Sequence, residues 1–414
     1  MRILHLIYDD LGNPWLDGGG AVRTLEINRR LAARGHQVIV GCGAYPGAPA
    51  SDIRGGVLYL RIGGPGGPPR GYLASRLRYA WGARALLKQV GYDIVVEDFS
   101  PYSPVLTPWR ARRGAAVAAS VQNLSGAHAI GKYGWGPRGL GPRVLERPLL
   151  RQFRYVLTVS PGIADEMRPW WHPGGPGHLT VIPNSTGHDL GDTASRSPTA
   201  EEPVILFLGR LDPYQKGLDT LLRAYAAAAP RMPGVRLEIA GGGAAEAVHQ
   251  LRAWAAESGL AVHEGDARRG AGPQVVLRGK LDGARATAAL RRCLFLALPS
   301  RYEAWPIVAI EAATCGRPVL GTDVVGVRDA APATAHGWLV PPADPAALAA
   351  GMVRLAGDPA LRQRLGEQGR AWAAQFTWDA LAARQEQFYQ AVLAEARAAA
   401  TPRGGRQERD SRPA

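Results

Sequence analysis

Cysteines and long apolar runs are both scarce in this sequence. The 414 residues include three cysteines, Cys42, Cys293 and Cys315, whose spacing matches no metal-binding motif. Two of them lie in apolar surroundings, so we expect reduced core thiols in a cytoplasmic protein. No apolar run approaches the about 18 residues needed to span a membrane, and the apolar start of the chain is interrupted by Asp9 and Asp10. These absences argue against a disulfide-stabilised secreted protein, a membrane-spanning protein and a signal peptide.

Lysine is also rare, because only four of the 49 basic residues are lysines. The excess of Arg, Ala and Gly is typical of a coding bias that affects a whole genome. The net charge is +14, and residues 1–190 hold most of it, with 22 basic against 12 acidic residues. A basic half can attract an anionic membrane surface, a phosphorylated acceptor or nucleic acid. No zinc-finger, RRM or helix-turn-helix pattern is present, so we do not expect nucleic acid as a partner.

The length and composition predict two globular domains. A chain of 414 residues is too long for one ordinary core, and 46% hydrophobic with 20% charged residues is typical of folded proteins. The polar segment 188–203 contains scattered Ser, Thr and Pro, which indicates a linker between the domains. The tail from residue 401 is short and polar, and we expect it to be disordered.

The first forty residues predict a strand, a glycine turn, a helix and a second strand. The turn contains Gly18, Gly19 and Gly20, the helix is expected over 21–34, and the second strand is QVIVGCG. Glycines before a helix let backbone N–H groups approach an anion, and the helix N-terminus favours a phosphate. A dinucleotide site is the alternative, but G-x-G-x-x-G is absent and no acidic residue closes the second strand.

The rest of the first half predicts further strands and a helix. The helix is expected over 73–88, either as a crossover helix packed on the sheet, which we favour, or as an amphipathic helix that faces a membrane. The strand AAVAASV ends at Gln122 and Asn123. A long loop rich in Gly, Pro and aromatic residues is expected over 124–142, and with His128 and Lys132 it could form the wall of an acceptor site.

The second half begins with the buried strand VILFLG, followed by the loop GRLDPYQKG and a helix. Arg210 and Lys216 in this loop can bind a diphosphate, since arginine offers a planar fork of donors and lysine a mobile point charge. The lysine is informative because this chain otherwise uses arginine at almost every basic position.

A second polar pair follows the apolar run 294–298. Pro299 and Ser300 end the expected strand, and a helix is expected from Ile307, so Glu303 lies in a loop and Glu311 inside the helix. Ligands bind at the carboxyl ends of parallel strands, and two carboxylates suit a ligand with several hydroxyls. The simpler alternative is an exposed loop charge and a solvated helix charge.

Taken together, these motifs resemble a known family. G-R…K-G, then E-x7-E followed by A-x-x-x-G-R-P-V, is similar to the signature of the retaining glycosyltransferases of family 4. The resemblance implies the α/β GT-B fold, in which two doubly wound, Rossmann-like domains face each other across a cleft. It also implies domains at 1–187 for the acceptor and 204–375 for the nucleotide sugar. A helix at 376–398 would pack back on the first domain.

The same resemblance implies roles for individual residues. Glu303 would contact the hydroxyls of the donor sugar, Glu311 the ribose, and the backbone of 279–281 the base, while a glycine loop centred on Gly326 would close over the donor. The implied catalytic residues are Arg210, Lys216 and Glu303; the donor-binding residues are Gly19, Gly20, Gly279, Lys280, Leu281, Glu311 and Gly326; and the acceptor- or sugar-binding residues are Gln122, Asn123 and His128.

This sequence departs from the family pattern at three positions. Gln122 stands where many relatives have a histidine that contacts the donor sugar, and His128 follows six residues later. The usual E-G-F-G reads Glu303 to Pro306, and Pro306 cannot donate a backbone hydrogen bond, so the sugar preference cannot be transferred. The usual N-G-V-D after the first domain begins with Asn184 but continues differently, which puts a role for Asn184 in doubt.

The resulting hypothesis is a retaining hexosyltransferase that uses a nucleoside-diphosphate sugar and no cofactor. No Asp-x-Asp pair stands where a metal-bound diphosphate would sit, so the expected catalysis is metal-independent. The acceptor is open among a glycolipid, a polysaccharide precursor and a small metabolite. We expect a cytoplasmic protein, with peripheral contact to the inner face of an anionic membrane as a further possibility. The alternatives are a non-catalytic sugar-nucleotide or glycan-binding protein and a related GT-B epimerase.

Overall fold

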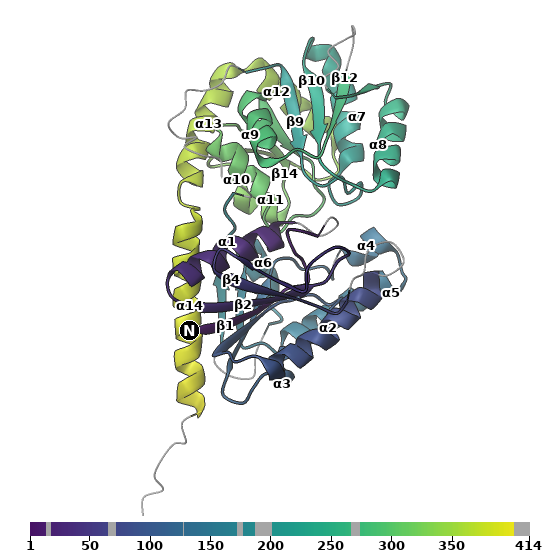
Figure 1. Ribbon diagram of the computed structural model, residues 1–414. Helices are drawn as coiled ribbons and strands as arrows, with labels where there is room; N and C mark the ends of the chain where they lie inside the picture. Colours follow the sequence, from purple (N-terminus) through teal and green to yellow (C-terminus); the bar gives the residue numbers. More distant parts are fainter. Residues whose placement is uncertain are drawn as a thin grey trace, which may run out of the picture.

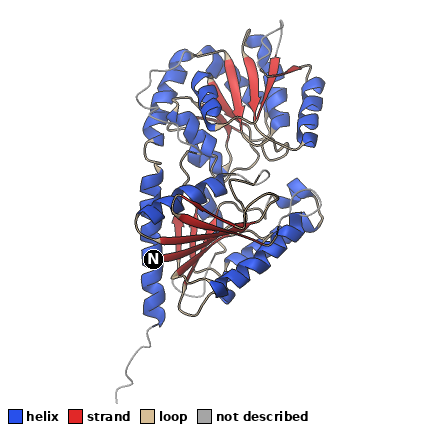
Figure 2. Cartoon of the chain, viewed as in Figure 1, coloured by secondary structure: helices blue, strands red, loops and turns tan. Residues whose placement is uncertain are grey.

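The computed structural model describes residues 1–13, 18–64, 72–126, 128–171, 177–186, 201–265 and 274–400. Within them the chain forms two α/β units, one above the other in Figure 1, each with a mainly parallel sheet and helices on both faces (Figure 2). The predicted fold class is confirmed. Residues 188–200 of the expected linker and the expected disordered tail lie outside the described residues.

The first sheet has eight strands among the described residues, in the order β3-β4-β2-β1-β5-β6-β7-β8. All neighbours are parallel except β3 and β4, which form an antiparallel pair at one edge. The strands are β1 Arg2–Leu6, β2 Gln37–Gly43, β3 Ser51–Arg54, β4 Val57–Ile62, β5 Ile94–Asp98, β6 Ala116–Val121, β7 Tyr155–Thr158 and β8 His178–Val181.

The second sheet has seven strands in the described part of the chain, all parallel, in the order β11-β12-β10-β9-β13-β14-β15. The order reverses between β9 and β13, where a doubly wound sheet opens a crevice for ligands. The strands are β9 Val204–Leu208, β10 Arg236–Ala240, β11 Ala261–Glu264, β12 Gln274–Gly279, β13 Phe295–Leu298, β14 Val319–Thr322 and β15 Gly337–Val340.

Helices connect the parallel strands, as crossovers require. Those of the first unit are α1 Gly19–Ala33, α2 Tyr72–Gln89, α3 Thr107–Arg110, α4 Ala129–Tyr133, α5 Pro137–Leu150 and α6 Pro161–Met167. Those that follow are α7 Leu218–Ala228, the short 3-10 helix η1 Ala229–Arg231, α8 Ala245–Glu257, α9 Gly283–Arg292, α10 Ile307–Thr314, α11 Val325–Ala330, α12 Pro345–Gly357, α13 Pro359–Ala373 and α14 Trp378–Ala400.

The last helix belongs to the core of the first unit although it follows the second in sequence. Along α14, Tyr389 and Val392 are fully buried against the first sheet and against Ile27 and Leu31 of α1. Figure 1 shows α14 as the long yellow helix that runs past α1 and the strands of the first sheet. The chain therefore crosses between the units twice.

A buried arginine forms hydrogen bonds both to the segment that leaves the first unit and to α14, which returns to it. Arg23 of α1 is 1% exposed, and its guanidinium donates to the carbonyl oxygens of Ile182 and Pro183, to Oδ1 of Asn184 and to Oε1 of Gln385 in α14. Burial lowers the pKa of Arg23 to about 10. Asn184 therefore lies in the crossing between the units, where Trp305 of the second unit donates to its carbonyl oxygen at 2.9 Å.

Several elements differ from the sequence-based expectation. The expected loop over 124–142 is wrong, because α4 and residues 137–142 of α5 lie within it. Its glycines and prolines disfavour a helix interior, but Pro137 occupies the first helical position, where its missing N–H costs nothing. Strands β3, β4 and β11 were not predicted.

Candidate functional site

The two units meet at the carboxyl ends of strands from both sheets, where the resemblance predicts the cleft. Figure 1 shows α1 and α6 of the first unit facing α10 and α11 of the second. A Cβ atom at Gly19 would come within 3.0 Å of Cδ1 of Ile307, and the backbone N–H of Gly162 in α6 donates to Oδ2 of Asp329 in α11 at 2.8 Å. The predicted glycine turn therefore lies on the cleft and touches the start of the helix that carries Glu311.

Gly19 and Gly20 form the first two positions of α1. Backbone N–H groups at these positions have no acceptor within the helix, and they point along the positive end of the helix dipole. The turn thus provides two amides that could bind an anion in the cleft.

The loop 209–217 follows β9 and carries the predicted diphosphate-binding residues. Asp212 shapes it, because its Oδ1 accepts from the backbone N–H of Gln215 at 2.9 Å and its carbonyl oxygen accepts from the N–H of Lys216 at 3.0 Å. Gly217 ends the turn at φ +61°, and a Cβ there would lie 2.1 Å from the carbonyl oxygen of Pro299. Only glycine fits both requirements, so Lys216 is held at a fixed point next to β13.

Lys216 and Glu303 form an ion pair at the centre of the site. The Nζ atom of Lys216 contacts Oε1 of Glu303, and that oxygen also accepts from the hydroxyl of Ser300 at 2.8 Å. Glu303 is 6% exposed. The predicted loop position of Glu303 after β13 is confirmed, and the structure brings two of the three predicted catalytic residues into contact. The third, Arg210, lies exposed in the same loop and has no ion pair among the described residues.

The backbone of Gly326 stabilises the loop that carries Glu303. The predicted glycine loop is wrong, since Gly326 lies in the first turn of α11. Its backbone N–H donates to the carbonyl oxygen of Glu303 at 3.1 Å, and a Cβ at this position would lie 2.4 Å from the carbonyl carbon of Ala304. The close approach of two backbones explains the glycine, and it holds the Glu303 loop in place.

The other predicted donor-binding residues lie around the same crevice. Glu311 is buried in the middle of α10, as predicted. Gly279 ends β12 at φ +64°, followed by the exposed Lys280 and the partly buried Leu281. A cavity of about 370 Å³ lies beside this segment and is lined by Leu211, Ile239, Gly241, Val248, Leu251, Glu264, Gly265, Leu277, Arg278 and Gly279. Nucleotide contacts at these residues stay a prediction.

Gln122 is held in one orientation by a buried carboxylate. Its Nε2 donates to Oδ1 of Asp98 at 3.3 Å and to the hydroxyl oxygen of Ser120 at 3.1 Å. Its Cγ and Oδ2 of Asp98 both lie within 4 Å of where a Cβ on Gly20 would be. Burial raises the pKa of Asp98 to about 7, although hydrogen bonds to Asp98 from Ser120 and Gln122 oppose the shift.

Asn123 and His128 meet a residue of the second unit that the sequence analysis did not select. The hydroxyl of Tyr302 donates to Oδ1 of Asn123 and accepts from the backbone N–H of Leu124 at 3.0 Å. The ring of His128 lies over the ring of Tyr302, with centroids 4.0 Å apart, and burial lowers the pKa of this histidine. Tyr302 directly precedes Glu303, and its place in that motif was the signal for its role.

Asp98 is the second residue that sequence analysis missed. It ends β5, next to β6 and Gln122, and the burial of its carboxyl group raises the pKa of that group. The signal was the polar end of the strand DIVVED, since polar residues at the carboxyl end of a buried parallel strand face the ligand crevice.

Three of the four lysines, Lys132, Lys216 and Lys280, also lie on elements that border the cleft.

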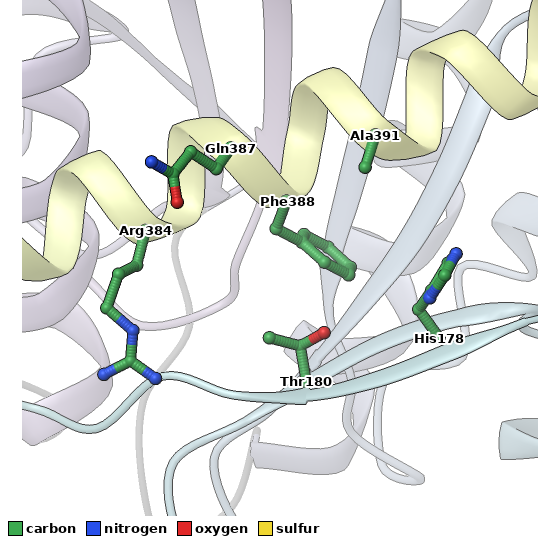
Figure 3. Close-up of a pocket in the computed structure, with 6 residues that line it drawn as sticks. All are labelled: His178, Thr180, Arg384, Gln387, Phe388 and Ala391. Carbon is green, nitrogen blue, oxygen red and sulfur yellow. The ribbon is translucent and has the colours of Figure 1, made fainter.

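A second hollow lies away from the cleft, between β8 and α14 (Figure 3). It is lined by His178 and Thr180 from β8 and by Arg384, Gln387, Phe388 and Ala391 from α14. Its polar groups serve the packing of the helix, because Arg384 donates to the carbonyl oxygen of Val181 and His178 contacts Glu395. Neither Lys216 nor Glu303 lines this hollow.

The described residues contain neither a candidate metal site nor a candidate membrane span. No three side chains of His, Cys, Asp or Glu converge there as a metal-binding group would. Within the same residues, no helix combines the length and the apolar character that crossing a bilayer requires. Catalysis without a metal stays a prediction.

Comparison with known proteins places both halves of the chain. Residues 17–189 match the family model described as Glycosyltransferase Family 4, and residues 202–358 match the model described as Glycosyl transferases group 1.

Two curated relatives extend over nearly the whole length. A glycogen synthase of Mycobacterium tuberculosis is 28% identical over 95% of this chain and 95% of its own. A phosphatidyl-myo-inositol mannosyltransferase of Mycobacterium leprae is 26% identical over 91% of this chain and 93% of its own. Among solved structures, the sucrose-phosphate synthase of Thermosynechococcus elongatus superposes with a TM-score of 0.77 at 23% identity, covering 95% of this chain and all of that one.

Proposed function

This chain belongs to glycosyltransferase family 4 and has the GT-B fold, and we propose that it is a retaining, metal-independent hexosyltransferase. The donor is a nucleoside-diphosphate sugar and the acceptor is a hydroxyl group. The observation that carries the proposal is the Lys216–Glu303 ion pair at the carboxyl end of β13, across the cleft from the amides of Gly19 and Gly20.

The chemistry follows from the charges in the cleft. As the sugar departs, further negative charge develops on the diphosphate, and stabilising that charge is the main demand on the protein. Arg210 and Lys216 supply positive charges, and the first amides of α1 supply hydrogen-bond donors. These groups could do what a divalent metal does in other transferases. Glu303, held by Lys216 and Ser300, is placed to accept hydrogen bonds from sugar hydroxyls.

Retention needs no protein nucleophile in this proposal. The acceptor oxygen would attack the anomeric carbon from the face that the diphosphate leaves. The acceptor proton would pass to the departing phosphate oxygen, so one C–O bond forms as another breaks. Gln122, with its amide nitrogen turned to Asp98 and Ser120, leaves its carbonyl oxygen to receive a hydrogen bond from a sugar or an acceptor hydroxyl.

A donor screen tests the function and the metal independence together. The purified protein is incubated with UDP-, GDP-, ADP- and dTDP-hexoses in the presence of a chelator, and release of the nucleoside diphosphate is followed. We expect slow release from one donor, unchanged by added Mg²⁺, and NMR of a transferred product should show the anomeric configuration of the donor. Binding without release, even with acceptor alcohols present, would favour the non-catalytic alternative. Release that requires Mg²⁺ would refute metal independence.

A basic and apolar surface on the first domain supports a membrane-associated acceptor. Helix α2 buries Tyr79 and Leu87 against the sheet, so the favoured crossover packing is confirmed, but its outer side exposes Leu73, Leu77 and Trp81. These residues are spaced at four positions and form one stripe. Trp109 of the adjoining α3 is also exposed, as are the basic residues Arg78, Arg110, Arg112 and Arg113.

This combination fits the surface of an anionic bilayer. Apolar side chains enter the interface while arginines contact lipid phosphates. One relative is named for a phosphatidyl-inositol acceptor, and a glycolipid or other lipid-linked acceptor would be presented to the cleft from such a surface. We therefore propose peripheral binding to anionic membranes through α2 and α3.

Vesicle binding tests this surface. Leu77→Ser combined with Trp81→Ser should lower binding to phosphatidylglycerol-containing vesicles by about tenfold or more, since each large side chain buried in the interface is worth about 1.5–3 kcal/mol. The matched control is Ile53→Ser, which removes an apolar side chain that is 74% exposed on β3. Equal binding by the double variant, or equal binding to neutral vesicles, would contradict the proposal.

A further inference from the structure

The segment 123–132 of the first domain contacts the second domain at two points, and the first is Tyr302. Oδ1 of Asn123 and the backbone N–H of Leu124 both bond to its hydroxyl, and the ring of His128 lies on its ring. Tyr302 is 7% exposed. A buried phenol hydroxyl with two partners and a ring contact fixes the position of its own backbone.

The second point is the loop that carries Lys216. The Nζ atom of Lys132 lies 2.5 Å from Oδ2 of Asp212 and 3.4 Å from Oε1 of Gln215. Burial opposes ionisation of Asp212, but the contact with Lys132 outweighs it and lowers the pKa of Asp212. Helix α4 packs closely here, because a Cβ at Gly131 would lie 2.1 Å from the hydroxyl oxygen of Tyr214.

Both contacts fall immediately before the central ion pair of the site. Gln215 precedes Lys216, and Tyr302 precedes Glu303. The side-chain amide of Gln215 donates to the carbonyl oxygen of Tyr302 at 3.3 Å, so the two contact points are also joined to each other. The first domain therefore holds both residues of the Lys216–Glu303 pair through their chain neighbours.

We propose that Lys132 and Tyr302 are positioning residues, which set the geometry of Lys216 and Glu303 from the acceptor side of the cleft. The proposal rests on the transferase function proposed above. Acceptor-side residues 123–132 would thereby align the donor-side pair, so that the site is complete only when the two domains are in this contact. Small misplacements of groups that stabilise a leaving diphosphate are costly in rate.

A double-mutant cycle separates this role from direct binding of the diphosphate by Lys132. The variants are Lys132→Met, Asp212→Asn and the combination; asparagine keeps the oxygen that accepts from the N–H of Gln215. We expect each single change to lower kcat by about tenfold to a hundredfold. The KM for the donor should change by less than about threefold, because the lost interaction acts on geometry. The combination should be no slower than the slower single variant.

Further variants make the result specific. Lys132→Arg, which can still pair with Asp212, should recover most of the rate. Tyr302→Phe keeps the ring contact with His128 but loses both hydrogen bonds, and it should also lower kcat while the donor KM stays near that of the wild type. The control is Lys88→Met, an exposed lysine near the end of α2. Melting temperatures of all variants should match the wild type within a few degrees.

Two results would overturn the proposal. Wild-type kcat in Lys132→Met would show that the contact is not needed. Losses that multiply in the combination, with a raised donor KM in Lys132→Met alone, would show that Lys132 acts on the donor and not through Asp212. If the wild-type protein itself releases no nucleoside diphosphate from any donor, the transferase function fails first, and the positioning role falls with it.

Discussion

Replacing Lys216 with methionine should lower nucleoside diphosphate release by about a hundredfold to a thousandfold, the range observed when one preorganised group that stabilises developing charge is removed. Methionine retains most of the aliphatic length of lysine and loses the charge. The effect has two causes, since the leaving diphosphate loses a cation and Glu303 loses the partner that fixes its Oε1 atom.

The measurement is single-turnover release from the donor found in the screen, together with the donor KM. Ser300→Ala is the companion variant, because it removes only the hydroxyl that also bonds to Glu303 Oε1 and should cost about tenfold or less. Lys88→Met again serves as the exposed-lysine control. A Lys216→Met enzyme within about threefold of the wild type would contradict the role of the ion pair in stabilising the leaving group.

The largest effect on stability is expected from Glu238→Gln in the second domain. Glu238 lies in β10 with a side chain that is fully inaccessible, and it accepts hydrogen bonds from Arg236, Arg278 and Arg292. Burial alone would raise its pKa, but the hydrogen bonds and charges of Arg278 and Arg292 outweigh it and lower the pKa to about 2. Neutralising this carboxylate removes the buried anion that the three arginines share and leaves Glu202 as the remaining partner of Arg236 and Arg292, so it should cost about 3 kcal/mol of unfolding free energy.

The pH dependence gives an independent check of that prediction. The folded pKa of Glu238 lies below the ordinary value of 4.5, so its contribution is fully present above pH 4.5 and is lost as the pH falls toward 2. The difference between wild type and Glu238→Gln in guanidinium unfolding should therefore be largest at neutral pH and shrink below pH 4.5.

Glu264→Gln is the matched control in the same domain, because Glu264 forms an ion pair with Arg252 while its side chain is 72% exposed. It should change the unfolding free energy by less than about 1 kcal/mol. A deficit for Glu238→Gln that is equally small, or that grows as the pH falls, would show that the three arginines do not depend on this carboxylate.

Much of the fold, and the positions of Lys216, Glu303 and Glu311 within it, could be predicted from the sequence. The strands that end before Arg210 and Glu303 are short apolar runs with clear stops, and the spacing from Glu303 to Glu311 spans a loop and one helix start. Such signals are local, because a buried parallel strand and the turn after it are specified by adjacent residues. Lys216 and Glu303 were selected separately, and the structure shows them in contact.

The segment that follows β6 was not predicted, because its helices are stabilised by contacts between residues that are distant in sequence. The Gly- and Pro-rich residues 124–142 contain no clear helical period, yet α4 and α5 form there, and the carboxylate of Glu146 accepts from the N–H groups of Ser125 and Gly126. Gly326 was misplaced for a related reason. A glycine is needed at position 326 because the Glu303 backbone approaches it closely, and no local sequence pattern reveals that approach.

The course of α14 determines how this protein could be recombined with its relatives. Since α14 completes the core around α1 and Arg23 bonds to Gln385 within it, the first unit is discontinuous and consists of residues 1–186 and the last helix. A hybrid enzyme that takes only residues 1–186 from another member would pack this chain's α14 against a foreign sheet and would lose the bond between Arg23 and Gln385. Exchange of the first unit therefore requires two joints, so that residues 1–186 and the last helix come from the same protein.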